Sequence, residues 1–202
     1  MKLKLLIILT LFSYVTLFSQ VVTTELIDMS EVVPRLKTNV KYATKDNFTG
    51  QKLYTIGKAF GTIPVANALK VINDSLSKDG LGLMVFDAYR PRAIQWFLWD
   101  IYPDPNFVAD PRSGSRHNRG AAVDLTLYDI ETGEELAMPT PFDDFSPQAG
   151  QNYQDLPEDV KRNRQMLRDV MTRNGFQIIT SEWWHYDHTG SIDYPLKEAQ
   201  MR

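Results

Sequence analysis

The stretch that decides the fold is SRHNRGAAVDLTLY, residues 115–128. Its second part, from Ala121 to Tyr128, is an apolar run of strand length and predicts a buried strand. Asp124 interrupts this run, and a carboxylate buried within a strand needs a polar or charged partner. His117 precedes a glycine and two alanines, whose small side chains leave room for a ligand. The stretch therefore predicts a strand that carries a polar site.

Around this strand, helical and strand patterns are mixed. Apolar residues recur at helical spacing in three segments, which predicts helices over residues 64–77, 92–102 and 158–173. Three further short apolar runs predict strands over residues 81–86, 176–180 and 183–186. The helices and strands do not alternate in a regular βαβ order, which favours an α+β fold over a doubly wound sheet.

The last predicted helix is strongly polar and has one apolar face. We expect this face to be buried and to consist of Val160, Met166, Leu167, Val170 and Met171. Asn174 and Gly175 follow the helix and are typical of a helix C-terminus.

Two of the three histidines, His117 and His185, lie in segments dense with other chemical groups, residues 115–124 and 182–185. A catalytic zinc ion takes three protein ligands from His and carboxylate side chains and leaves a fourth position for water. His117, Asp124 and His185 would supply this set, and Glu182 is placed to act as the general base. The spacing alone is a weak signal, because most such His–Asp pairs are structural or surface residues. The third histidine, His188, is expected to be a surface residue at the end of the last strand.

Glu182 and His185 pose a geometric problem. In a regular strand, residues three apart point to opposite faces of the sheet. If both side chains face one metal ion, the chain must bend or bulge between them.

Arg90 follows the predicted strand over residues 81–86, in the segment DAYRP. A cation at this position could stabilise the oxyanion that develops when a carbonyl group is attacked. The alternative is a surface arginine paired with Asp87, and the local pattern does not decide between the two.

Charge and cysteine content exclude several classes of function. The net charge of −3 gives no electrostatic reason to expect a nucleic-acid partner. The chain has no cysteine, which excludes thiolate metal ligands, a cysteine nucleophile and a lipid anchor on cysteine.

The N-terminus has the pattern of a secretory signal peptide. Lys2 and Lys4 precede a mostly apolar run from Leu5 to Phe18, and Ser19 is followed by ordinary polar sequence. The alternative is a membrane anchor, but the run is short for a membrane span and no basic cluster follows it. We therefore expect residues 1–19 to be a signal peptide and residues 20–202 to form one domain. The protein would be secreted or periplasmic, without stable membrane association after cleavage.

Five segments together resemble the D-alanyl-D-alanine dipeptidases of the VanX type, within a wider group of zinc D-Ala-D-Ala peptidases. The resemblance runs from about residue 40 to residue 186. Its segments, in the family's order, are KYATKDNFTG (41–50), DAYRP (87–91), SRHNRGAAVDLTLY (115–128), PFD (141–143) and EWWHY (182–186). It implies a single compact α+β domain, with a mainly antiparallel sheet flanked by helices and a zinc site on the sheet.

The resemblance also implies roles for the residues of the catalytic centre. His117, Asp124 and His185 match the ligands of one zinc ion per chain. Glu182 matches the general base, which later donates a proton to the leaving amine. Arg90 matches the stabiliser of the tetrahedral intermediate.

For the substrate, the resemblance implies a free dipeptide in a small, enclosed site. Asp143 matches the carboxylate that receives the dipeptide's ammonium group. Ser115 matches a contact to its C-terminal carboxylate, with Tyr42 or Tyr54 as a second contact. Two prolines, Pro139 and Pro141, depart from the family pattern just before Asp143.

Three alternatives to a dipeptidase remain open at this point. The first is a peptidoglycan D,D-carboxypeptidase or endopeptidase of the same zinc group, which would act on longer peptides. The second is a non-catalytic zinc-binding module, and the third is a purely structural secreted domain. The presence of Glu182 disfavours the second, and the ordered set of polar residues disfavours the third.

Overall fold

The computed structural model describes residues 24–190 and 193–199, so the expected signal peptide lies outside the described residues. A five-stranded sheet forms the centre, in the order β2-β4-β5-β7-β6. Its strands are β2 (Lys37–Thr38), β4 (Leu81–Asp87), β5 (Ala122–Asp129), β6 (Phe176–Ile178) and β7 (His185–His188). Only the β2–β4 pair is parallel, so the prediction of a mainly antiparallel sheet is confirmed.

A second, two-stranded sheet pairs β1 (Leu26–Asp28) with β3 (Phe60–Thr62). Sequence patterns did not predict β1, β2 or β3, because each has only two or three residues and is too short for a detectable period.

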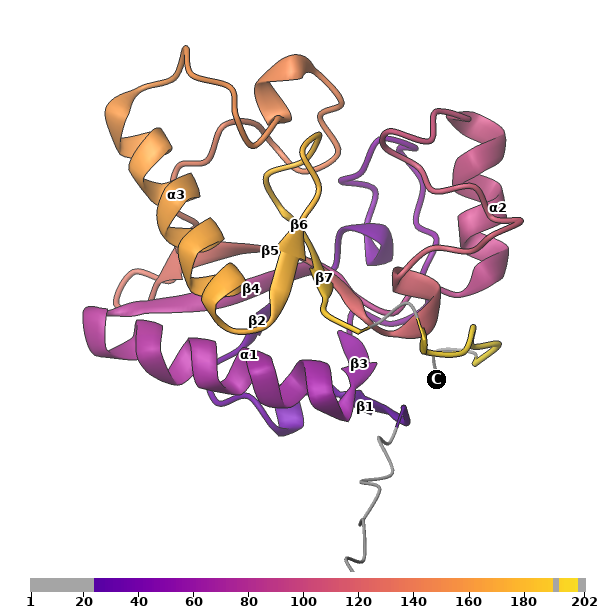
Figure 1. The fold of residues 1–202 in the computed structure, drawn as a ribbon, viewed down its shortest axis with the longest axis horizontal. Coiled ribbons are helices and arrows are strands. Elements are labelled where there is room, and N and C mark those ends of the chain that lie inside the picture. The colour runs from indigo at the N-terminus through magenta and orange to yellow at the C-terminus, as the bar shows by residue number, and fades with distance from the viewer. Residues whose placement is uncertain (1–23, 191–192, 200–202) are drawn as a thin grey trace, which may run out of the picture.

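Three α-helices surround the central sheet, close to their predicted positions. They are α1 (Ile63–Leu76), α2 (Arg92–Ile101) and α3 (Glu158–Arg173). In Figure 1, α1 runs below the sheet, α3 lies above it, and α2 stands to one side. The α+β fold class is therefore confirmed. Within the part of the chain that the structure describes, no helix has the length and apolar character needed to cross a membrane.

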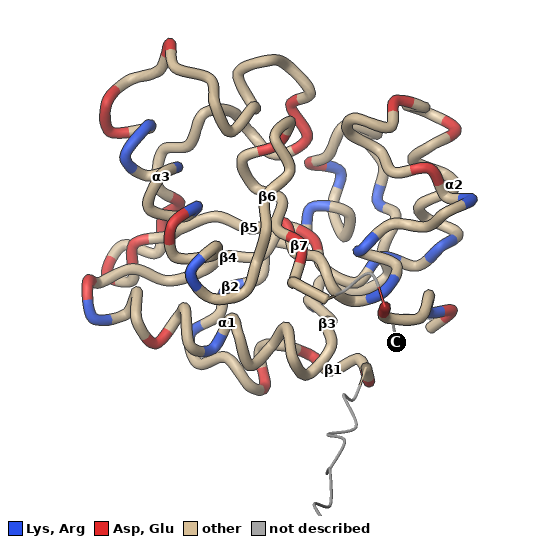
Figure 2. The backbone as a smooth tube through the Cα atoms, in the orientation of Figure 1, with Lys and Arg blue, Asp and Glu red and all other residues tan. Residues whose placement is uncertain are grey.

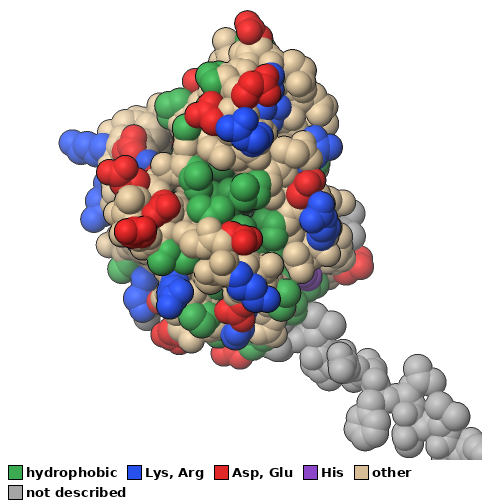
Figure 3. All heavy atoms as spheres, turned by 90° about the vertical axis from the view of Figure 1, so that its left-hand side faces the viewer, with side chains coloured by type: hydrophobic (Ala, Val, Ile, Leu, Met, Phe, Trp, Pro, Cys, Tyr) green, Lys and Arg blue, Asp and Glu red, His purple; other side chains and the backbone are tan. Residues whose placement is uncertain are grey.

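The buried face of α3 differs from the prediction at two positions. Val160, Leu167 and Met171 are buried as expected, but Met166 is 41% exposed. Its place on the inner face is taken by Arg164, which is only 5% exposed. Seen from the side of α3, a group of apolar side chains reaches the surface near the centre of the face, with smaller apolar areas and charged groups around it (Figure 3).

The register of the central strands aligns the polar residues of three segments. Asp124 on β5 pairs with Asp87 on β4 and with His185 on β7. The β4–β5 register shifts between Val85 and Asp87, which lets Asp87 and Asp124 lie opposite each other. The pairing therefore brings together groups that are separated by 37 and 61 residues along the chain.

Candidate active site

His117 is oriented by a tight turn that precedes β5. A short 3-10 helix over His117–Arg119 ends at Gly120, which adopts a left-handed conformation with φ of 65°. The left-handed conformation favours glycine at this position, and a Cβ there would also contact the end of the Leu26 side chain. The His117 Nδ1 lies 2.7 Å from the Ala88 carbonyl oxygen. Because a carbonyl only accepts, Nδ1 carries the proton and Nε2 presents a lone pair.

His185 is oriented in the same way by a carboxylate. Its Nε2 lies 3.1 Å from an Asp187 oxygen, two residues along β7, and can donate to it; with the proton on Nε2, Nδ1 is left to present its lone pair to a metal ion. Asp187 was not predicted as a site residue. Residues two apart in a strand share a face, so this pairing could have been found from the sequence once β7 was correctly placed.

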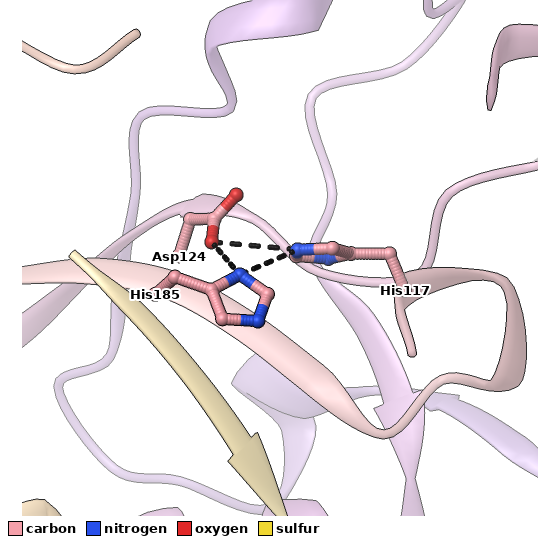
Figure 4. A group of neighbouring side chains, drawn as sticks. All are labelled: His117, Asp124 and His185. Carbon is pink, nitrogen blue, oxygen red and sulfur yellow. Dashed lines mark hydrogen bonds and ion pairs between the residues drawn. The ribbon is translucent and has the colours of Figure 1, made fainter. Parts of the chain in front are cut away.

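Three electron-pair donors converge where β5 and β7 meet (Figure 4). His185 Nδ1 is 2.9 Å from an Asp124 carboxylate oxygen, and His117 Nε2 is 3.4 Å from the same oxygen. The two ring nitrogens lie 3.2 Å apart. All three side chains are buried. Without an ion, shared protons can hold these atoms at such distances; with the protons removed, the three lone pairs would face one point, and the donor set is one that zinc prefers. The residues therefore fit a divalent metal ion.

The electrostatics of this cluster favour positive charge. Burial alone would raise the pKa of Asp124, but the charges and hydrogen bonds of His117 and His185 outweigh burial and lower it. Burial alone would lower the pKa of His185, but hydrogen bonds to Asp124 and Asp187 raise it well above its usual value. Both shifts indicate that the protein stabilises a cation at this point.

Glu182 lies in a bend before β7. The strand predicted over residues 183–186 is therefore wrong in its bounds, since β7 begins at His185. This difference resolves the geometric problem, because Glu182 is free of the strand's alternation. The Glu182 carboxylate is 4.0 Å from His185 Nδ1, and burial raises the pKa of Glu182 to about 8. A cation in the adjacent cluster would favour the charged carboxylate and lower that pKa.

The bend that carries Glu182 is fixed by a side chain that the sequence did not point to. The amide Nε2 of Gln151, a residue only 2% exposed, lies 3.2 Å and 3.3 Å from the main-chain oxygens of Glu182 and Trp183. The Gln151 main-chain N–H also donates to the Thr180 oxygen. Gln151 thus supplies the hydrogen bonds that a regular strand would have given this segment.

Arg90 is buried and paired at the same time, so the two interpretations from sequence combine. It is 7% exposed, which excludes a surface arginine, and its Nε and Nη2 donate to one Asp87 oxygen at 2.9 and 2.8 Å. Its Nη1 donates to Gln95 at 2.9 Å, and Nη2 is 3.8 Å from Asp124. The other Asp87 oxygen accepts from the Tyr54 hydroxyl at 2.8 Å. Arg90 is thus held in a fixed orientation beside the metal-ligand cluster.

Asp143 stands at another wall of the same cavity. It has a positive φ of 62°, uncommon for a non-glycine residue. One of its oxygens accepts from the Tyr42 hydroxyl at 3.3 Å and the other from the Phe48 main-chain N–H at 3.3 Å. Burial raises the pKa of Asp143 to about 8, and among the described residues no cationic group lies within 4.0 Å of this carboxylate.

A cavity of about 440 Å³ joins these groups. Eight of the nine residues predicted for the site line it, namely Tyr42, Arg90, Ser115, His117, Asp124, Asp143, Glu182 and His185. The ninth, Tyr54, does not line the cavity, and its hydroxyl contacts Asp87. The prediction for His188 was also inaccurate: it ends β7 but is half-buried, with its ring 5.4 Å from that of Phe176.

Comparison with known proteins identifies the family. A profile described as D-Ala-D-Ala dipeptidase matches residues 22–200. The chain belongs to the D-Ala-D-Ala dipeptidase family. It is 39% identical to the D-alanyl-D-alanine dipeptidase of Escherichia coli over 179 residues, covering 89% of this chain and 92% of that protein. It is 37% identical to the Streptomyces coelicolor dipeptidase and 33% identical to that of Enterococcus faecium, with 78% of this chain and 88% of the relative covered in each case.

Membership in the D-Ala-D-Ala dipeptidase family makes the protein an enzyme, a peptidase of a metallopeptidase family. Some residues that support this site were not predicted from the sequence. Gln95, Gln151 and Asp187 contact or orient predicted site residues through hydrogen bonds or ion pairs. Gln151 gives no local signal, because it is 31 residues from the group that it holds.

Proposed function

We propose that this protein is a zinc-dependent dipeptidase that hydrolyses D-Ala-D-Ala to two D-alanines. The observation that carries the proposal is the convergence of the lone pairs of His117, Asp124 and His185 in a cavity that also holds Glu182 and Arg90. The names of the relatives support the same substrate.

Bound at the three ligands, Zn²⁺ would supply Lewis acidity, which activates a water molecule and polarises the scissile carbonyl. Glu182 takes a proton from the attacking water and later gives one to the leaving amine. Arg90, oriented by Asp87 and Gln95, offsets the negative charge that develops on the attacked carbonyl oxygen. Its fixed orientation means that little reorganisation is needed during the reaction.

Specificity for a free dipeptide would come from the two ends of the substrate. Asp143 is a partly buried carboxylate with no cation within 4.0 Å among the described residues, and a substrate ammonium group would supply the missing charge. Tyr42 holds the Asp143 carboxylate in place. Ser115, buried in the cavity wall, is placed to contact the C-terminal carboxylate.

A comparison of two substrates and two enzymes tests this assignment. N-acetyl-D-Ala-D-Ala brings no cation, so wild-type kcat/KM should fall at least ~100-fold relative to the free dipeptide, because a buried carboxylate is then left unpaired. Asp143→Ala should lower kcat/KM for the free dipeptide and so reduce the difference in kcat/KM between the two substrates. Equal cleavage of both substrates by the wild type would mean that the enzyme is a D,D-carboxypeptidase or endopeptidase and not a dipeptidase. An unchanged difference in Asp143→Ala would place the ammonium site elsewhere.

We also propose that the enzyme is exported and acts outside the cytoplasm. The support is the basic start and apolar run of residues 1–19. The mature chain should begin close to Gln20. N-terminal sequencing of the purified cellular protein tests this, and an intact Met1 on soluble cytoplasmic protein would contradict it.

A further inference from the structure

A second polar cleft, of about 370 Å³, lies between α3 and the turn at residues 151–154. It shares no lining residue with the catalytic cavity. Half of its lining side chains are cationic and half are amides: Lys161, Arg162, Arg164 and Arg168, with Gln151, Asn152, Gln154 and Gln165. The basic positions on α3 can be followed in Figure 2.

The positive charge of this cleft is largely uncompensated. Lys161 forms an ion pair with Glu158 on the same helix. Within residues 24–190 and 193–199, no carboxylate lies within 4.0 Å of the guanidinium groups of Arg162, Arg164 or Arg168. Their polar partners are uncharged: Arg164 donates to the Gly150 oxygen at 3.0 Å, and Arg168 to the Asn152 side chain at 3.4 Å.

Arg164 is the most unusual of these residues because it is 5% exposed. Charged side chains are rarely buried without a partner of opposite charge, since the loss of hydration is expensive. Burial and the neighbouring charge of Arg168 together lower the pKa of Arg164. Two adjacent guanidinium groups, one of them buried, form a local positive potential that an anion would relieve.

Gln151 lies at the inner end of this cleft. Its amide nitrogen is committed to the Glu182 and Trp183 carbonyls, and its side chain also interacts with the Tyr186 hydroxyl, so this amide belongs to the protein's own hydrogen-bond network. The groups that remain open to a ligand are the guanidinium groups of α3 and the other amides of the lining.

We propose that this cleft is a binding site for a polar molecule bearing an oxyanion, a phosphate or carboxylate group held by Arg164 and Arg168. The planar guanidinium fork matches both groups in a bidentate manner. The amides that line the remaining space suit a ligand that also carries hydroxyl or amide groups. The inference is independent of the reaction assigned to the catalytic cavity.

Isothermal titration of the zinc-loaded enzyme tests the proposal. The probes are inorganic phosphate and succinate, added at constant ionic strength, and the comparison of the two separates a phosphate site from a carboxylate site. We expect one saturable binding event for at least one probe. Arg168→Gln should weaken it by about 10-fold or more, because a charge-assisted hydrogen bond and one unit of charge are lost.

The matched control is Arg173→Gln. Arg173 lies on the same helix but is exposed, pairs with Asp169 and does not line the cleft. This variant should bind the probe as the wild type does. That result would distinguish a specific site from non-specific attraction of anions to the positive charge of α3. Arg164→Gln should abolish binding, with circular dichroism to verify folding. Absence of saturable binding with both probes, or unchanged affinity in Arg168→Gln, would overturn the proposal.

Discussion

The catalytic cavity and the α3 cleft are both polar, but their buried charges have opposite signs. In the catalytic cavity, the buried carboxylates Asp124, Glu182 and Asp187 outnumber the buried cation Arg90. In the α3 cleft, guanidinium groups occur without carboxylates among the described residues. A folded domain tolerates such imbalance where a ligand of the missing sign restores it. The comparison therefore predicts cations for the first site, namely a metal ion and a substrate ammonium group, and an anion for the second.

The largest effect should come from removing a metal ligand. His117→Ala should abolish both zinc binding and activity, because two ligands cannot hold a catalytic ion tightly. Elemental analysis of the wild type should return about one zinc per chain, and removing zinc with a chelator should also abolish activity. His188→Ala is the matched control, since His188 does not line the cavity, and it should retain zinc. Active wild-type enzyme without a divalent metal would refute the proposed chemistry.

The next prediction contrasts a paired and an unpaired buried arginine. Arg90→Met leaves Asp87 buried without its cation and should lower the free energy of unfolding by about 3–5 kcal/mol. Arg164→Met removes a buried charge that has no carboxylate partner, and it should change stability by no more than about 1 kcal/mol in either direction. Urea unfolding of the metal-free proteins, without added anions, measures both. Equal destabilisation by the two variants would contradict the contrast between the sites.

A smaller effect should follow from removing the carboxylate behind His185. Asp187→Ala takes away the acceptor of the His185 Nε2–H and should weaken zinc affinity by about 10- to 100-fold. Competition with a chromophoric chelator gives this affinity. Asp193→Ala, in an exposed position on the following segment, serves as the control. The idea fails if the two variants bind zinc equally well.

The smallest effect should come from Gln151, which touches neither the metal ligands nor the cavity. Gln151→Leu should reduce kcat by about 10- to 100-fold through displacement of Glu182, with KM and zinc content nearly unchanged. Gln154→Leu, on the exposed part of the same turn, is the control. A variant that loses thermal stability but keeps its kcat would show that Gln151 has only a structural role.

Sequence patterns predicted the parts of the molecule that local physics determines. α3 has the predicted bounds, and α1, α2 and β4 differ from theirs by a residue or two at an end, because apolar period and terminal residues specify them. The resemblance supplied the residues that now line the cavity together. The missed features are non-local: β7 begins two residues later than predicted because two buried tryptophans, Trp183 and Trp184, precede it as a bend. The apolar run therefore indicated burial correctly but not strand pairing.

The α3 cleft is a second feature that sequence patterns could not predict. A polar helix with four arginines is typical of a solvated face, and the sequence contains nothing to mark Arg164 as buried. Only the packing of the turn at Gly150 against α3 distinguishes it from its exposed neighbours. Whether a charged side chain is buried, and whether it has a partner of opposite charge, depends on tertiary contacts that the local sequence does not reveal.

The alignment of Asp87, Asp124 and His185 across three neighbouring strands has a consequence for folding, because it makes metal binding depend on the correct strand register. If β5 slipped by one residue, its side chains would exchange faces, and Asp124 would leave both the metal ligands and the neighbourhood of Arg90. A misaligned chain could therefore be compact and yet unable to capture the ion. Since only the correctly aligned sheet gains the free energy of metal binding, zinc would select the correct strand alignment as the chain folds.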